Sequence, residues 1–116
     1  EEWHKVINVN LNSLFFCTKA AIPEMQKAGG GVIINTASVD GLVGMSTICH
    51  YVSAKHAVIG LSKTCALEYA ADNIRCLAIC PGYVKTPMVS DGFAKEEADL
   101  ITMMTPLGRP AAPEEV

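Results

Sequence analysis

Apolar residues recur at helical spacing along the first quarter of the chain. They mark one face of a helix over residues 3–27, and Gly29-Gly30-Gly31 then ends that helix. Pro23 is expected to bend the helix or to end its regular part. The apolar positions that define the face are Val6, Val9, Leu14, Phe15, Ala21, Ile22 and Met25.

Two near-continuous apolar runs follow, at residues 32–37 and 74–80. Each is short and bounded by turn residues, so we predict two strands that are apolar on both faces, as in the interior of a parallel sheet. Between them we predict a glycine-rich loop over residues 38–47 and a second long helix over residues 48–71. Because each crossover is longer than a dozen residues, the element order predicts an α/β fold with parallel strands in a right-handed βαβ arrangement.

The rest of the chain is more polar. Residues 86–106 carry several methionines and two short helix-like pieces around residues 94–104. This segment fits a mobile flap over a site and an ordinary surface connection equally well. The first residues of the chain resemble a helix start, and Pro113 begins the first turn of another helix. We therefore expect both ends to lie inside a domain, and residues 1–116 to belong to a single domain.

Composition narrows the classes of partner. Half of the 116 residues are hydrophobic and 18% are charged, which favours a buried core over disorder. The formal net charge is −3 and the few basic residues are scattered, so the chain offers no basic surface for nucleic acid. No apolar run approaches the roughly 20 residues that span a bilayer. Neither nucleic acid nor a membrane is an expected partner.

The cysteines and histidines lack the spacing of a metal site. The five cysteines are odd in number and have no C-x-x-C pair, so we expect reduced thiols in the core of a cytoplasmic protein. No metal ligand set is predicted. For His50, beside Tyr51, we favour a surface or helix-start role over a substrate contact. The cysteines are Cys17, Cys49, Cys65, Cys76 and Cys80.

Tyr51 and Lys55 carry the candidate chemistry. They lie four residues apart on the second predicted helix, close to one turn, so their side chains share a face. A phenol is a poor acid or base at neutral pH, but a neighbouring ammonium favours the phenolate. Such a tyrosine can exchange a proton with a carbonyl or alcohol oxygen. Ser38, thirteen residues earlier at the end of a predicted strand, is able to donate a hydrogen bond to the same oxygen.

Together with Asn10, 28 residues before Ser38, and with the Pro81-Gly82 turn that precedes Thr86, these residues resemble the classical short-chain dehydrogenase/reductase (SDR) family. The resemblance covers residues 3–116, the C-terminal catalytic half of such an enzyme. It implies a partial doubly wound, Rossmann-type parallel sheet without the N-terminal nucleotide-binding strands. It also implies interconversion of a secondary alcohol and a ketone by hydride transfer with NAD or NADP.

The resemblance implies a role for each matching residue. Tyr51 would be the acid/base, Lys55 would assist it and hold the nicotinamide ribose, and Ser38 would orient the substrate carbonyl. Asn10 would support a water in a proton relay. The implied cofactor contacts are Tyr51, Lys55, Pro81, Gly82, Val84 and Thr86. The implied substrate contacts, mostly apolar, are Ser38, Val39, Met45, Ile48, Tyr83 and Met88.

In the family, the helices at residues 3–27 and 48–71 form the main subunit contact, so the resemblance implies a homodimer or homotetramer. One departure is Leu77, which stands where the family usually has asparagine and which we expect to make a buried packing contact.

Two other interpretations stay open. A truncated chain could keep the helix pair as a non-catalytic dimerisation module that binds no cofactor. The extended branch of the superfamily, with epimerases and dehydratases of sugar nucleotides, shares the Tyr-x-x-x-Lys pair. The Asn10 spacing and the PG-x-x-x-T turn fit the classical branch better.

Overall fold

The computed structural model describes residues 1–90, 92 and 94–116. The chain divides into two compact units, Glu1–Cys80 and Pro81–Val116. The first unit holds the long helices and the sheet, and the second holds short helices and turns. The α/β class predicted from the sequence is confirmed by the first unit.

The N-terminal helix is continuous but changes its pitch near its start. It consists of α1 (Glu2–Ile7), the π-helical segment η1 (Asn8–Asn12) and α2 (Ser13–Ala28). The helix runs through Pro23 to Ala28, so the regular part does not end at the proline. Because Pro23 is exposed, water can bond the carbonyl that the proline leaves without a donor.

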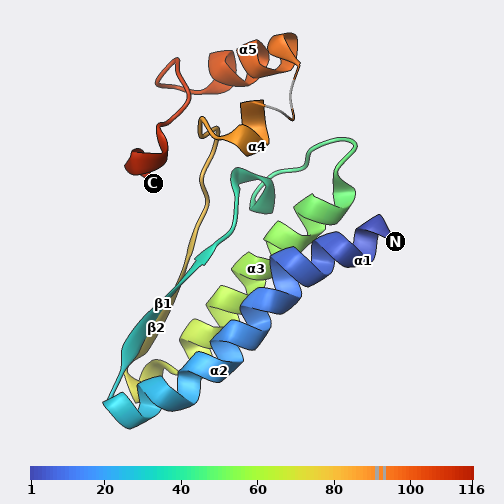
Figure 1. Ribbon diagram of the computed structural model, residues 1–116. Helices are drawn as coiled ribbons and strands as arrows, with labels where there is room; N and C mark the ends of the chain where they lie inside the picture. The colour runs from blue at the N-terminus through green and yellow to red at the C-terminus, as the bar shows by residue number, and fades with distance from the viewer. Residues whose placement is uncertain (91, 93) are drawn as a thin grey trace. The chain divides into compact units, whose positions relative to one another are not determined.

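Two parallel strands form the sheet. β1 (Gly31–Thr36) pairs with β2 (Ile74–Ile79) in a register that sets Gly31 beside Ile74 and Thr36 beside Ile79. The short turn η2 (Val39–Gly41) follows β1, and α3 (Cys49–Glu68) and η3 (Ala70–Asp72) lead back to β2. Figure 1 shows α2 and α3 running along the same side of the two strands. The predicted parallel sheet is confirmed.

The turns that precede the two strands are hydrogen-bonded to each other. Asn73, in the left-handed conformation with φ of 58°, accepts the amide of Gly31 on its carbonyl at 3.1 Å, and its side chain donates to the carbonyl of Gly29 at 3.3 Å. Gly30 has φ of 143°, and a Cβ there would lie 2.6 Å from Asn73. The glycine triplet is therefore a tight turn, as predicted. The turn at Asn73 also ends α3 at Glu68, three residues before the predicted boundary.

The core lies between the helices and the inner face of the sheet. Ile22 of α2 and Cys65 of α3 pack against Ile74 and Cys76 of β2. A buried polar pair completes it, in which the amide of Asn35 donates to the hydroxyl of Ser62 at 3.0 Å. The core-thiol prediction is right for Cys65 and Cys76. It is wrong for Cys17 and Cys49, which lie on outward positions of their helices and are exposed.

The outer face of the sheet is apolar and exposed. Alternate residues of each strand point away from the helices, and the exposed fraction is 59% for Ile34 and 49% for Leu77. The prediction that Leu77 makes a buried packing contact is therefore wrong, because its place in the alternation of β2 sets it on this face. The other apolar residues of the face are Val32 and Ile79.

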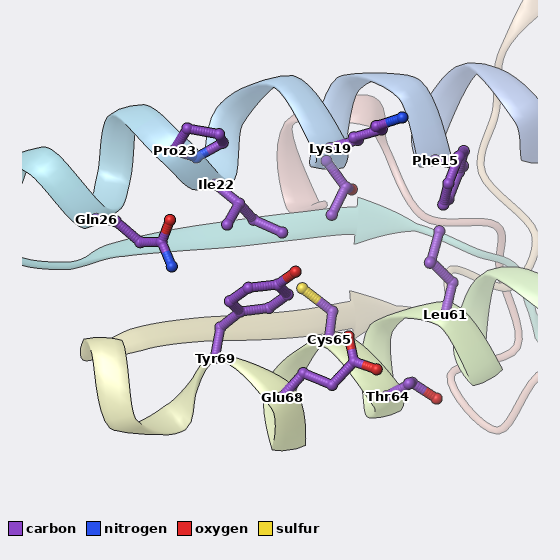
Figure 2. A pocket seen from close by; sticks show the side chains of 11 residues that line it. Phe15, Lys19, Ile22, Pro23, Gln26, Leu61, Thr64, Cys65, Glu68 and Tyr69 are labelled. Atoms are coloured by element: carbon purple, nitrogen blue, oxygen red, sulfur yellow. The ribbon is translucent and has the colours of Figure 1, made fainter.

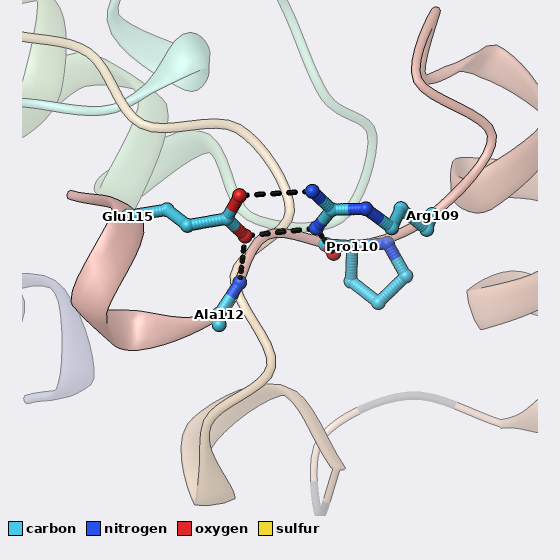
Figure 3. A network of polar contacts seen from close by, with 4 residues as sticks. All are labelled: Arg109, Pro110, Ala112 and Glu115. Atoms are coloured by element: carbon cyan, nitrogen blue, oxygen red, sulfur yellow. Dashed lines mark hydrogen bonds and ion pairs between the residues drawn. The ribbon is translucent and has the colours of Figure 1, made fainter.

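The second unit is built from short elements. A bridge between Val84 and Ala111 joins its start to its end. A single helix, α5 (Lys95–Met104), occupies the range in which two helix-like pieces were predicted, and the short helix α4 (Pro87–Ser90) precedes that range. Near the end, η4 (Pro113–Glu115) is capped by the Glu115 carboxylate, which accepts the amide of Ala112 at 2.7 Å and two bonds from Arg109, each 2.8 Å (Figure 3). The Arg109 guanidinium lowers the pKa of Glu115 to about 2.

Candidate active site

Ser38 lies two residues beyond the end of β1 and is buried. Its Oγ accepts a hydrogen bond from the amide of Asp40 at 3.1 Å, which caps η2. A hydroxyl that accepts in this way keeps its own hydrogen for a second partner. Ser38 is thus a turn cap, and its hydroxyl can still donate to a substrate oxygen.

Tyr51 and Lys55 lie one turn apart near the start of α3. The Lys55 Nζ is 5.5 Å from the centroid of the Tyr51 ring, within the range of a cation–π contact. Tyr51 is half-buried, and Lys55 is only 8% exposed. The predicted pairing of the phenol with the ammonium is confirmed as a geometry.

Lys55 also joins α3 to the sheet. Its Nζ donates a hydrogen bond to the carbonyl of Thr36, the last residue of β1, at 2.9 Å. Burial of the ammonium lowers the pKa of Lys55 from its ordinary value. Because Ser38 follows Thr36 by two residues, this bond brings the start of α3 and the end of β1 into one region. Tyr51 and Lys55 therefore lie near the carboxyl end of β1, which Ser38 follows, and open α/β sheets bind ligands at that end of their strands.

Asn10 lies in the π-helical segment η1, which packs against α3. Its Nδ2 donates to the carbonyl of Val6 at 3.1 Å, so the amide group is fixed within its own helix. π-Helical turns inside α-helices are frequent at functional sites. The side-chain oxygen of Asn10 is an acceptor available to a water, and the predicted relay stays a prediction.

Besides Ser38, three of the predicted substrate residues belong to the first unit. Val39 lies in η2, Met45 lies in the loop that follows it, and Ile48 immediately precedes α3. Val39 and Met45 are exposed and Ile48 is half-buried. In the same loop, Thr47 has φ of 71°, the left-handed region that β-branched residues rarely adopt.

The other predicted contacts belong to the second unit. The amide of Ala111 donates to the carbonyl of Tyr83 at 2.9 Å, and the carbonyl of Thr86 accepts the amide of Val89 at 3.0 Å. Met88 in α4 is exposed. How these residues combine with Ser38, Tyr51 and Lys55 stays a prediction. The second-unit set is Pro81, Gly82, Tyr83, Val84, Thr86 and Met88.

A groove of about 530 Å³ runs between α2 and α3, and its lining includes none of the predicted catalytic residues (Figure 2). Phe15 and Ile22 of α2 and Leu61 of α3 give it an apolar lining. Lys19 and Glu68 bring opposite charges to the two walls. The groove is thus a feature of the helix pair and separate from the Tyr51–Lys55 site.

Within residues 1–90, 92 and 94–116, no three His, Cys, Asp or Glu side chains are grouped as a metal site would need. Over the same residues, every helix is too short or too polar to cross a bilayer.

Sequence reasoning assigned His50 to the surface or to the helix start, and the structure confirms the second, since its Nδ1 accepts the amide of Tyr51 at 2.7 Å. It missed the Lys55 bond to the Thr36 carbonyl and the π-helical segment around Asn10.

Residues 1–97 match the family described as short chain dehydrogenase. The whole chain is 47% identical to the cyclohexanol dehydrogenase of Acinetobacter sp. (strain SE19), of which it covers 45%. Among solved structures, 98% of the chain superposes on a 3-oxoacyl-[acyl-carrier protein] reductase from Brucella melitensis with a TM-score of 0.91 and 39% identity, covering 42% of that chain.

A second solved structure is a candidate NAD(P) dependent gluconate 5-dehydrogenase from Beutenbergia cavernae with bound NADP. It has a TM-score of 0.93 and 34% identity, and the match covers 97% of this chain and 46% of that protein. The chain thus spans less than half of the length of these three proteins.

Proposed function

Since this chain belongs to the short chain dehydrogenase family, we propose that it provides the catalytic part of an oxidoreductase. The proposed enzyme interconverts a secondary alcohol and a ketone with NAD or NADP. In the whole protein, residues 1–116 form part of one Rossmann-type domain. The observation that carries the proposal is that Lys55 contacts both the Tyr51 ring and the carbonyl of Thr36, two residues before Ser38.

Tyr51, Lys55 and Ser38 have different roles in the proposed reaction. In the oxidation direction the alcohol loses one hydride and one proton. The nicotinamide, when bound, supplies or accepts the hydride. Tyr51 exchanges the proton with the substrate oxygen, and Lys55 favours the phenolate through its charge. Ser38 donates its hydroxyl hydrogen to that oxygen, because its lone pair already accepts the amide of Asp40.

The donor set fits a nicotinamide nucleotide. Lys55 offers an ammonium for a ribose hydroxyl. Among the residues that the structure describes, it donates one hydrogen bond, to the Thr36 carbonyl, so two of its hydrogens can serve other acceptors. We assign the further cofactor contacts to Pro81, Gly82, Val84 and Thr86. Asn10 holds a water in the proton relay.

The substrate is a small-molecule alcohol or ketone. Apolar side chains at Val39, Met45, Ile48 and Met88, with Tyr83, favour a hydrocarbon body around the reacting carbon. The names of the similar proteins refer to cyclohexanol, to 3-oxoacyl-[acyl-carrier protein] and to gluconate, so membership of the family leaves the substrate open.

The test replaces Tyr51 by phenylalanine in the complete natural protein that contains these residues. Turnover of a panel of secondary alcohols with NAD and NADP falls by at least about a hundredfold, the scale of general acid/base catalysis. The Kd for NADH or NADPH, read by nucleotide fluorescence, stays within about twofold because only one hydroxyl is lost. Tyr69→Phe, which removes a hydroxyl near the end of the same helix, is the matched control. Undiminished turnover in Tyr51→Phe would overturn the acid/base assignment.

The proposed partner is a second copy of the same chain. The outward faces of α2 and α3 expose Phe15, Phe16 and Leu67, with exposed fractions of 46%, 63% and 82%. Lys19 and Glu68 lie on the two walls of the groove. In a two-fold symmetric dimer, Lys19 of each copy would pair with Glu68 of the other copy.

Light scattering after size exclusion tests this partner. Phe16→Glu should shift a dimer or tetramer towards a smaller species. Met103→Glu, at an exposed position of the second unit, should leave the mass unchanged. Equal masses for both variants would contradict the interface. The five free thiols fit a reducing compartment such as the cytoplasm.

The second candidate is a helix-pair module that binds no cofactor, which the exposed groove between α2 and α3 favours. It differs from the dehydrogenase in one measurable property. A protein that forms the dimer but leaves NADH fluorescence unchanged would support the module, whereas saturable binding supports the oxidoreductase.

A further inference from the structure

The first turn of α3 carries Tyr51, but it begins at a residue with no polar side chain. Ile48 occupies the N-cap, and the first bond of the helix runs from the amide of Val52 to the carbonyl of Ile48 at 3.0 Å. The amides of the three residues between them, Cys49, His50 and Tyr51, therefore find no acceptor in the preceding helical turn. The turn that holds the acid/base candidate needs an acceptor from elsewhere.

His50 supplies that acceptor. Its Nδ1 accepts the hydrogen bond from the amide of Tyr51 at 2.7 Å. Because an imidazole nitrogen that accepts is unprotonated, the neutral ring carries its hydrogen on Nε2. That Nε2 lies 3.5 Å from Oε1 of Glu2 in α1, and α1 packs against α3. The ring is thus held between the backbone of Tyr51 and a carboxylate of the neighbouring helix.

The two contacts of His50 differ in strength. The side chain of Glu2 is 82% exposed, so water and salt weaken its attraction for the ring. The side chain of His50 is 20% exposed, and its bond to the Tyr51 amide is short. The effect of His50 on Tyr51 therefore rests on the backbone bond, and Glu2 serves to orient the ring.

Tyr51 is fixed from the other direction by Lys55. Lys55 lies one turn later, with its Nζ 5.5 Å from the Tyr51 ring and bonded to the carbonyl of Thr36 at 2.9 Å. The turn between them is anchored to the sheet at one end and capped by His50 at the other. The direction of the Tyr51 phenol depends on both anchors.

We propose that His50 is a positioning residue for Tyr51, acting as a substitute N-cap in its Nε2–H tautomer. The inference rests on the proposed function where it concerns turnover, because it takes Tyr51 as the acid/base. His50 itself takes no part in the proton exchange. Its role is to hold the amide of Tyr51, and through it the first turn of α3.

The test uses the complete natural protein with three variants. His50→Phe keeps a ring and removes the acceptor, and His50→Asn returns an acceptor oxygen near the place of Nδ1. His56→Phe makes the matched change at an exposed histidine of the same helix. We expect His50→Phe to lower kcat about tenfold, the effect of one lost helix cap, with the Kd for NADH within about twofold. We expect His50→Asn to recover to within about threefold of the wild type, and His56→Phe to stay within about twofold.

Hydrogen exchange at the Tyr51 amide, read by NMR, tests the same contact without any activity. Exchange should be about tenfold faster in His50→Phe than in the wild type or His56→Phe, and slow again in His50→Asn. A wild-type protein without oxidoreductase turnover would refute the proposed function, and the exchange rates would still decide the role of His50. Unchanged exchange in His50→Phe, or a His50→Asn variant as impaired as His50→Phe, would overturn the inference.

Discussion

Replacement of Lys55 by methionine separates the functional role of the residue from its structural one. The substitution removes the ammonium and keeps a long unbranched side chain of similar volume in the buried position. Two effects on stability then oppose each other. The hydrogen bond to the Thr36 carbonyl is lost, and so is the cost of burying a charge, which is seen in the lowered pKa of Lys55.

The size of each effect sets the expected balance. A hydrogen bond to a charged group contributes roughly 1.5–3 kcal/mol. Burial of the ammonium offsets part of that gain. We therefore expect Lys55→Met to change the free energy of unfolding by no more than about 1 kcal/mol near neutral pH. Turnover should fall by at least about a hundredfold, since the charge that favours the Tyr51 phenolate is gone.

The pH dependence has a definite sign. Because the pKa of Lys55 is lower in the folded state than in the unfolded one, the unfolded chain binds more protons between the two values, and stability rises with pH there. The cost of the buried charge is fully present below the folded-state pKa and is absent above the ordinary value. The wild type should therefore gain stability over Lys55→Met as the pH rises through that window.

Urea unfolding of the complete natural protein, followed by circular dichroism at several pH values, measures both quantities. Lys63→Met, on the same helix and exposed, is the matched control and should alter neither stability nor turnover. The reasoning is refuted if Lys55→Met loses more than about 3 kcal/mol, because the lysine would then act chiefly as a structural anchor. A stability difference that stays flat with pH would also refute it.

Three other predictions concern the chain itself. Thr47→Gly should stabilise it by about 0.5–1 kcal/mol in urea unfolding, because φ of 71° strains a β-branched residue more than the flexibility of glycine costs; a lower midpoint would contradict this. Burial raises the pKa of Cys65 to about 11, so a disulfide reagent should modify Cys65 only after unfolding. The exposed Cys49 should react in the folded chain, and equal reaction rates for the two thiols would contradict the prediction. The hydrogen bonds from Arg109 lower the pKa of Glu115 from 4.5 to about 2, so their contribution is present above the ordinary value and is lost as the pH falls through about 2. In Arg109→Gln an NMR titration should move the Glu115 pKa back towards its ordinary value, and an unmoved pKa would rule the arginine out as the cause.

The fold was predictable where the pattern of apolar residues was strong. Helical spacing and the glycine triplet located the first helix and its end, and two aliphatic runs located the strands to within one residue at each end. The face occupied by Leu77 was not predictable, because it depends on the alternation of β2 in the folded sheet. Nor was the π-helical segment at Asn8–Asn12, since π and α turns use the same residues and differ only in the carbonyl that each amide selects.

The site was predictable as far as side-chain spacing could carry it. Tyr51 and Lys55 had to share a helix face, and Ser38 had to follow a strand. The partner of Lys55 is a backbone carbonyl at a strand end, which any residue at position 36 would offer, so the sequence holds no sign of it. The cap at the start of α3 was predictable in part. The sequence shows that Ile48 has no side-chain acceptor and that His50 lies two residues later, but it does not show the bond from the Tyr51 amide to His50.

The inner face of the β1–β2 pair is covered by helices, whereas the outer face is exposed. Experiments on the two faces therefore report on different properties of the chain. Lys55 reaches the Thr36 carbonyl from α3, which covers the inner face. The outer face instead presents Ile34 and Leu77 to solvent, and an apolar sheet face requires a second layer. A layer on the outer face would therefore leave the contacts of Lys55 in place. Self-association of the isolated chain through Ile34 and Leu77 would accordingly report on the uncovered sheet, whereas the Tyr51, His50 and Lys55 variants report on the site.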